Sequence, residues 1–288
     1  MSVQTLAAPA PSAPSAVADS YARLSEVFSG LRVTELGHEE QAPQGGGWVT
    51  AARLAEGGAD LDAFLAWDNA QVLKDYGTQA RPDVIASFGL HRYAWPATLL
   101  FTVPWFLHRR VPRYPVRNVS FQRTLGRMAV RTESFACLPD DPAATLPGAR
   151  VVPDEEALRA EVREAVAEHL GPLLDGFGPR MRRRSRALWS VATDEIVEGL
   201  WYVAHLLGEE RRAMTELERL LPGATKPYVG AAAFRRPTGP DGEPAPVTRD
   251  RVSCCMFYTL RPEDTCVTCP RTCDAERVAR LSAADTAN

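Results

Sequence analysis

The sequence contains no apolar run long enough to cross a membrane. Its longest, AWPATLLFTVPWFL at residues 94–107, is interrupted by Pro96 and Pro104 and falls short of the roughly 20 apolar residues that a spanning helix needs. The N-terminal stretch MSVQTLAAPAPSAPSAVADS lacks the positive region and unbroken apolar core of a secretion signal. We therefore expect a cytoplasmic protein that is not integral to a membrane, with residues 1–16 forming a disordered Ala/Pro/Ser tail.

A strong excess of charge and the usual nucleotide-binding motifs are also missing. With 33 Lys and Arg against 36 Asp and Glu, the formal net charge is −3, which gives the whole chain no reason to bind nucleic acid. No G-x-G-x-x-G follows a strand-like segment, no P-loop occurs, and GGGW at residues 45–48 follows a loop-like stretch. A built-in nicotinamide or flavin is therefore not expected, and redox chemistry would need an external electron donor.

Histidine is scarce and scattered. The five histidines form no ligand-like pair: His38, His91, His108, His169 and His205. His169 and His205 fall on predicted helices, where we expect them to pack or to lie at the surface. Asp194, Glu195 and Glu198 share one predicted helix, and we expect them to lie on its solvent-facing side.

Helical periodicity dominates the rest of the chain. Apolar residues recur at helical spacing, which predicts helices over residues 21–31, 59–76, 82–95, 153–171, 184–207 and 209–221. Gly77 can end the second of these, and Pro153 with acidic residues can begin the fourth. The helix over 184–207 is apolar around much of its circumference, so we expect it at the centre of the core.

Short alternating segments in the middle of the chain predict strands. Residues 116–124 and 125–138 alternate weakly, 140–153 resemble a loop with a short final strand, and 226–236 are a further strand candidate. The polar, Pro- and Gly-rich residues 235–250 are expected to form a mobile loop. We predict an α+β fold, predominantly helical with a small antiparallel sheet from the middle and C-terminal strands. Residues 17–288 would form a single composite domain.

Cysteine is rare except in one segment. Cys137 stands alone in a strand-like stretch, and we expect it to be buried as a small apolar residue. The other five cysteines lie in CCMFYTLRPEDTCVTCPRTC, residues 254–273. Crowded thiolates repel one another unless a cation holds them, so the spacing C-C-x10-C-x2-C predicts a metal site near the C-terminus. Its residues are Cys254, Cys255, Cys266 and Cys269.

The spacing also bears on which metal is bound. Zinc ribbons use two C-x2-C knuckles around one tetrahedral ion, and here only residues 266–269 form such a knuckle. A 2Fe–2S cluster takes two protein sulfurs at each of two irons. Spacing favours the iron–sulfur cluster over zinc and leaves open which cysteine binds which iron. With both irons fully ligated, such a cluster suits electron transfer.

The cysteine segment resembles a known family. RVSCCMFYTLRPEDTCVTCP is similar to the cluster-binding segment of the FhuF-type ferric-siderophore reductases, which has an arginine before a Cys-Cys pair, an aromatic residue shortly after it, and ten residues leading to Cys-x2-Cys-Pro. RALWSVATDEI, residues 186–196, more loosely resembles a Trp-centred helix of that family. The matching positions are Arg251, Cys254, Cys255, Tyr258, Cys266, Cys269 and Pro270.

The resemblance implies a cofactor and an activity. It implies a 2Fe–2S cluster held by the four named cysteines within a segment spanning 251–273. It also implies one-electron reduction of ferric siderophores, which releases ferrous iron in the cytoplasm, with a ferredoxin or a reductase as the external donor. Cys273 is a fifth thiol that the family pattern does not require, and we expect it to be a spare.

Two other functions use the same cysteines. One is a non-redox protein that binds a siderophore or a partner and carries structural zinc on the C-terminal thiols. The other is an iron–sulfur sensor; sensors that act on DNA usually bring a recognisable DNA-binding element, and we find none. Metal content separates the first from a reductase.

Three segments outside the cysteines are candidate binding surfaces. HRYAWP (91–96) and HRRVPRYP (108–115) mix cationic and aromatic side chains that could face an anionic or amide-rich chelate, such as a hydroxamate siderophore. The competing interpretation places Trp95, Trp105 and Phe106 in the core and the arginines in solvent. RMRRRSR (180–186) could dock an acidic ferredoxin or could be a solvated helix flank.

Overall fold

Long helices form the main layer of the protein. A computed structural model describes residues 15–239 and 242–285, and over these residues the fold is predominantly helical, with 54% of residues in helices. The described α-helices are α1 (Ala18–Val27), α2 (Ala51–Ala55), α3 (Ala59–Tyr76), α4 (Pro82–His108), α5 (Glu155–Met181), α6 (Ser185–Leu206), α7 (Glu210–Leu220) and α8 (Asp274–Asp285).

Three small sheets accompany the helices in the described part of the chain. The largest has the order β1-β5-β4-β2 and is mixed, because β1 runs parallel to β5 while the other pairs are antiparallel. The second has the order β3-β6-β7, and the third is the antiparallel pair β8-β9. The strands are β1 (Arg32–Glu35), β2 (Trp48–Thr50), β3 (Val111–Pro112), β4 (Val119–Gln122), β5 (Arg127–Val130), β6 (Phe135–Cys137), β7 (Ala149–Val151), β8 (Phe234–Arg235) and β9 (Thr248–Arg249).

The predicted α+β class is confirmed, but one expectation about the sheets is wrong. The middle strands do not share a sheet with the C-terminal strands; β4 and β5 pair with β1 and β2 from the N-terminal part of the chain. Strand pairing depends on long-range packing, which the short alternations in the sequence do not specify. Four short 3₁₀ helices, η1 (Val116–Asn118), η2 (Arg123–Leu125), η3 (Pro142–Thr145) and η4 (Phe257–Thr259), complete the described elements.

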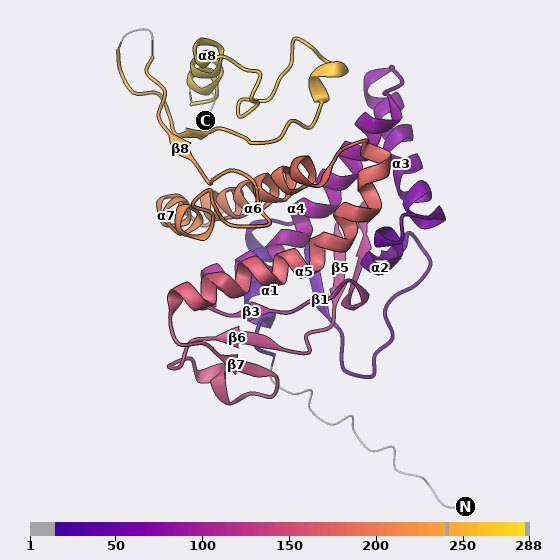
Figure 1. Cartoon of the computed structure of the whole chain (residues 1–288), viewed down its shortest axis with the longest axis vertical. Helices are drawn as coiled ribbons and strands as arrows, with labels where there is room; N and C mark the ends of the chain where they lie inside the picture. The colour runs from indigo at the N-terminus through magenta and orange to yellow at the C-terminus, as the bar shows by residue number, and fades with distance from the viewer. Residues whose placement is uncertain (1–14, 240–241, 286–288) are drawn as a thin grey trace, which may run out of the picture.

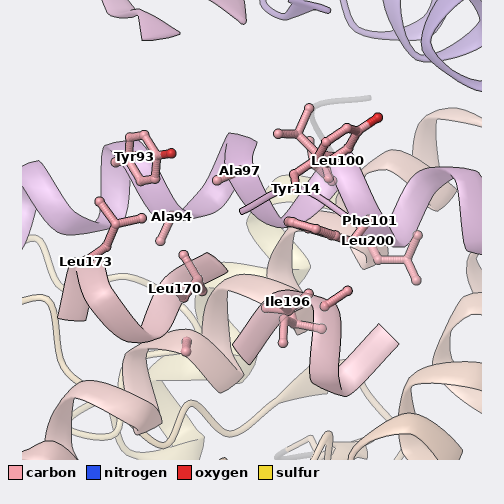
Figure 2. Close-up of a cluster of buried hydrophobic side chains, with 14 of the residues drawn as sticks. Tyr93, Ala94, Ala97, Leu100, Phe101, Tyr114, Leu170, Leu173, Ile196 and Leu200 are labelled. Carbon is pink, nitrogen blue, oxygen red and sulfur yellow. The ribbon is translucent and has the colours of Figure 1, made fainter. Parts of the chain in front are cut away.

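The core lies where α4 meets α5 and α6. Figure 2 shows side chains of α4, among them Ala94 and Ala97, gathered with Leu170 of α5 and with Ile196 and Leu200 of α6, all buried. α4 extends through Pro96 and Pro104 to His108, well past the predicted end at residue 95. Burial on nearly every side of this helix outweighs the two backbone hydrogen bonds that the prolines cannot donate. No helix among the described residues combines enough length and hydropathy to span a bilayer.

The helix boundaries follow local signals where these are strong. α3 coincides with the predicted residues 59–76 and ends at Gly77, whose φ of 64° is the left-handed conformation that glycine favours. α5 continues to Met181 through Pro172, ten residues past the predicted end.

The C-terminal residues lie over α6, at the opposite end of the molecule from β3, β6 and β7 (Figure 1). Residues 235–250, predicted to be a loop, contain β9 and a bridge between Thr238 and Pro244; residues 240 and 241 lie outside the described part. Residues 1–14 of the predicted tail also lie outside the described part. That part begins at residue 15, and the next two residues, Ala16 and Val17, are buried. The division into tail and single domain stays a prediction.

Candidate metal centre

A buried aspartate on α6 fixes the start of the cysteine segment. The Asp194 carboxylate is fully buried and accepts hydrogen bonds from the backbone N–H of Val252 at 3.1 Å and of Ser253 at 2.6 Å. The Ser253 hydroxyl donates to the same carboxylate at 2.5 Å. The two residues immediately before the Cys-Cys pair are therefore bound to a helix of the core.

Two arginines that precede the Cys-Cys pair neutralise the acidic residues of α6. Arg249, only 1% exposed, donates to Asp194 at 2.9 Å and to Glu198 at 2.7 Å. Arg251 lies 3.6 Å from both the Asp194 and the Glu195 carboxylates. The expectation that these acids face solvent is wrong for Asp194 and Glu195, because the C-terminal segment covers this side of α6. A carboxylate on a side of a helix that another segment covers is removed from water and needs cationic partners.

The second pair of cysteines sits on a tight turn held by α8. The backbone N–H of Cys269 donates to the carbonyl of Cys266 at 3.0 Å, and the Thr272 hydroxyl donates to the same carbonyl at 3.0 Å. Arg277 of α8, 2% exposed, donates to the carbonyls of Val267 at 2.8 Å and Cys269 at 3.2 Å. The C-x2-C turn is thus fixed by a buried guanidinium.

The structure brings four thiols together. Cys254 lies close enough to Cys269, Cys255 to Cys266, and Cys266 to Cys269 for each thiol to shift the pKa of a neighbour. Cys269 is buried, Cys254 and Cys255 are half-buried, and Cys266 is exposed, which places the group close to the surface. Cys273 is exposed at the start of α8 and has none of these thiol contacts. Within the described residues, no three His, Cys, Asp or Glu side chains converge as ligands of a single ion do.

Backbone N–H groups and neighbouring thiols surround these sulfurs. Met256 adopts a left-handed φ of 66° directly after the cysteine pair, and its N–H donates to the Cys254 sulfur at 3.4 Å. The hydrogen bond from the Cys266 thiol lowers the pKa of Cys255 to about 7, with help from the Phe257 N–H and against the effect of burial. The same contact with Cys255 raises the pKa of Cys266.

Two cavities flank the cysteine pair. Cys255 lines a cavity of about 510 Å³ whose apolar wall includes Phe28, Trp67, Trp95 and Phe121. Cys254 lines a different cavity of about 350 Å³. Neighbouring thiols in the chain thus line different cavities.

The charged side chains of the larger cavity are compensated from within the protein. Arg92 and Arg123 both bind the fully buried Asp68, through hydrogen bonds of 2.8 Å and 2.5 Å. The Arg123 guanidinium also lies 4.3 Å from the centre of the Trp67 ring. Across the cavity, the acids of α6 are paired with Arg249 and Arg251 as described above.

His91 and Arg251 are polar residues of this cavity with unused hydrogen-bonding capacity. Its Nδ1 is hydrogen-bonded to Glu195, while its buried Nε2 has no partner among the described residues. The Nε of Arg251 is likewise buried without a hydrogen bond. Both atoms belong to side chains that line the larger cavity.

The candidate binding segments meet different outcomes. Four residues of the segment 91–96 line the larger cavity: His91, Arg92, Trp95 and Pro96. Residues 108–115 do not reach it: their arginines form ion pairs with Glu216, Asp141 and Glu161, and Trp105 and Phe106 are buried. The sequence did not reveal Trp67, Phe121 and Arg123 as cavity residues. Together they have the mixed aromatic and cationic character of a binding surface, but they are far apart in the sequence, so only the fold shows that they lie near one another.

The isolated histidine and cysteine behave as expected. Cys137 is fully buried in β6. His169 is buried between the Tyr93 hydroxyl at 2.9 Å and the Tyr114 carbonyl at 2.8 Å. Neither takes part in the thiol group.

Fold and site together define an α+β protein with a cysteine-rich metal segment on its surface. Residues 251–271 match the family described as FhuF 2Fe-2S C-terminal domain, which confirms the resemblance over the segment that carries it. The match contains the four clustered cysteines and ends before Cys273. No curated protein sequence matches the chain.

The match and the clustered cysteines identify the cofactor of this segment as a 2Fe–2S cluster. The donor set fits such a cluster, because four thiols lie together and backbone N–H groups point at Cys254 and Cys255. Hydrogen bonds of this kind to the sulfurs are among the features that set the potential of an iron–sulfur centre.

Proposed function

We propose that this protein reduces ferric siderophores by one electron, using a 2Fe–2S cluster on Cys254, Cys255, Cys266 and Cys269, and releases ferrous iron in the cytoplasm. The observation that carries the proposal is the position of Cys255, a cysteine of the matched segment, in the wall of a 510 Å³ cavity. Small-molecule sites usually measure roughly 300–1,000 Å³, so the cavity is large enough to receive much of a chelate.

Reduction alone is sufficient to free the metal. Siderophores bind ferric iron through hard oxygen donors, which hold ferrous iron much less strongly. No covalent bond of the chelate has to break, so no general base or nucleophile is needed. When bound, the cluster supplies electrons one at a time.

The cavity residues favour a chelate without a large charge. Arg92, Arg123 and Arg251 line the cavity with Glu195 and Glu198. Behind the wall, the buried Asp68, Asp194 and Arg249 pair with these residues and bring the group to four cations and four carboxylates. No net positive charge is left to compensate a trianionic tris-catecholate chelate of ferric iron. A neutral tris-hydroxamate chelate would place its apolar arms on Trp67 and Trp95 and meet no uncompensated charge.

His91 and Arg251 supply the polar contacts. The Arg251 guanidinium, whose Nε has no hydrogen bond, can donate to the oxygens of a chelate. Because Nδ1 of His91 donates to the Glu195 carboxylate, the unpartnered Nε2 can accept from an N–H or hydroxyl group of the chelate. Glu195, hydrogen-bonded to Nδ1, orients the imidazole ring. A buried polar atom without a partner is costly, and the oxygens and N–H groups of a bound chelate would satisfy both atoms.

The test uses anaerobically purified protein. We expect two irons and two acid-labile sulfides per chain, and a visible spectrum that bleaches with dithionite and recovers when a neutral ferric tris-hydroxamate is added. Ferrous iron released in step with the recovery, trapped by a ferrous-specific chelator, would complete the evidence. Zinc without sulfide would instead leave a structural metal site, and a reduced cluster that no ferric chelate reoxidises would refute the reductase.

A further inference from the structure

The second cavity next to the cysteine pair carries a surface suited to a protein partner. Cys254 lies in its wall together with Met256, Tyr258, Pro270, Arg183 and Arg271. Val252, at the edge of the same cavity, is 37% exposed. Apolar and aromatic side chains ringed by arginine are the composition of a protein interface, in which Met, Tyr and Arg are enriched.

The arginines around this cavity are not compensated by the fold. Arg183 lines the cavity. Its neighbours Arg182 and Arg184 lie on the connection between α5 and α6, Arg186 lies in the first turn of α6, and all four are exposed. Among the described residues, none of the four forms an ion pair, and Arg183 makes only a 3.3 Å contact with the Met256 sulfur. This contrasts with the larger cavity, where every arginine has a carboxylate partner.

Two further contacts define the charge of this surface. The Arg271 guanidinium stacks 4.0 Å above the Tyr258 ring and has no carboxylate partner among the described residues. Asp83, near the first turn of α4, is already bound by Arg81 through 3.1 Å hydrogen bonds. That contact and the Arg182 guanidinium lower the pKa of Asp83. We call Arg182, Arg183, Arg184, Arg186 and Arg271 the basic surface.

We propose that the basic surface docks an acidic one-electron carrier protein, which reduces the cluster from the Cys254 side while the chelate occupies the Cys255 side. This inference rests on the proposed function and adds the partner to it. The reduced carrier loses one electron, the 2Fe–2S cluster gains it, and ferric iron in the chelate finally takes it up. No bond is made or broken in the carrier.

Charge complementarity is the reason for choosing an acidic carrier. Complementary surfaces accelerate encounter by roughly 10- to 1,000-fold at low ionic strength, and the effect fades as the screening length shrinks to about 8 Å at physiological salt. Electron-transfer complexes are small, often below about 1,200 Å² of buried surface, so a cavity edge with a few arginines is a sufficient contact. The surface lies beside a thiol of the cluster segment, which keeps the transfer distance short.

The experiment uses the holoprotein and a reduced, acidic 2Fe–2S ferredoxin as the probe. Stopped-flow absorbance would follow cluster reduction, and calorimetry would measure binding of the oxidised ferredoxin, each at low and high ionic strength. In R183E/R271E we expect both the second-order rate constant and the affinity to fall by about tenfold or more at low ionic strength. The deficit should shrink as salt is added.

A second variant and a control protect the result from folding artefacts. R184E/R186E places acidic residues at the first turn of α6, where the helix dipole favours them, and should show the same loss. R211E reverses an exposed arginine of α7 that lines neither cysteine cavity and should behave as wild type. Equal losses in R211E and R183E/R271E, or no measurable binding of the ferredoxin to wild type at low ionic strength, would overturn the docking proposal.

The same variants keep the two proposals separable. Dithionite reduces the cluster without using a docking surface, so dithionite-reduced R183E/R271E should still be reoxidised by a ferric tris-hydroxamate. If that reoxidation occurs but the ferredoxin binds all variants alike, only the docking proposal fails. If the ferredoxin binds as predicted but no chelate reoxidises the protein, the reductase activity fails and the docking surface stands.

Discussion

Asp194 and Ser253 are joined twice, through the Ser253 N–H at 2.6 Å and the Ser253 hydroxyl at 2.5 Å, inside a region closed to water. Asp194 is a residue of α6, and Ser253 immediately precedes the Cys-Cys pair. The position of the pair relative to the core therefore depends on one carboxylate.

Replacing that carboxylate should release the segment. In D194N the amide would face two N–H donors and leave Arg249 short of a counter-charge, so we expect the free energy of unfolding to fall by about 3–5 kcal/mol. Iron and sulfide content should fall with it. Denaturant titration and metal analysis measure both, with E198Q as the control: its side chain is 36% exposed, and it should lose less than about 1 kcal/mol. Undiminished cluster content in D194N would contradict this role.

The four clustered thiols should differ from the fifth. C254S and C269S each remove a sulfur from the contacts that join the group, so we expect loss of the visible cluster spectrum. C273S removes an exposed thiol outside these contacts and should retain iron, sulfide and spectrum. Full cluster content in C269S would exclude the proposed ligand set, and cluster loss in C273S would make Cys273 a ligand.

Trp67 should contribute to chelate affinity and not to cluster chemistry. Its ring lines the larger cavity and is held by Arg123, so W67L should weaken binding of a ferric tris-hydroxamate by about tenfold, or about 1.4 kcal/mol. Reduction by dithionite should be unchanged. W201L removes a tryptophan of α6 that packs on Phe234 instead and should bind the chelate as wild type does. Equal affinities for W67L and wild type would remove this cavity as the binding site.

The charge of the chelate should decide which siderophore binds. Because the four cations and four carboxylates around the larger cavity balance, a neutral ferric tris-hydroxamate should bind more tightly than a trianionic ferric tris-catecholate. Competition titrations at constant ionic strength would rank the two. D68N leaves Arg92 and Arg123 without their shared acid and, if it folds, should shift the ranking toward the anion.

Acid should destabilise the fold through His169. Burial lowers the pKa of this histidine from 6.5 to about 4, although the Tyr114 carbonyl opposes the shift. Above pH 6.5 the residue is neutral in both states and its full contribution is present; as pH falls toward 4, only the unfolded state binds the proton. The total loss is about 3 kcal/mol. Denaturant unfolding between pH 7.5 and about 5.5 should show a slope that H169Q lacks and that H205Q, at an exposed position, keeps.

The sequence was most informative where signals are local. The stop at Gly77 and the tight C-x2-C turn depend on residues adjacent in the chain, and the matched segment is contiguous. What could not be predicted depends on distant partners. Asp194 was assigned to solvent because its covering segment comes more than fifty residues later, and Trp67 meets Cys255 in one cavity only because α3, α4 and the C-terminal segment converge.

Cys254 and Cys255 are neighbours in the chain yet open onto different cavities. If a chelate binds at one and a carrier protein at the other, neither occupies the other's place. The two partners could then bind at the same time and in any order, and a large excess of carrier would not inhibit turnover. The turnover rate would saturate independently with the concentration of each partner, as in an enzyme that has a separate binding site for each of its two substrates.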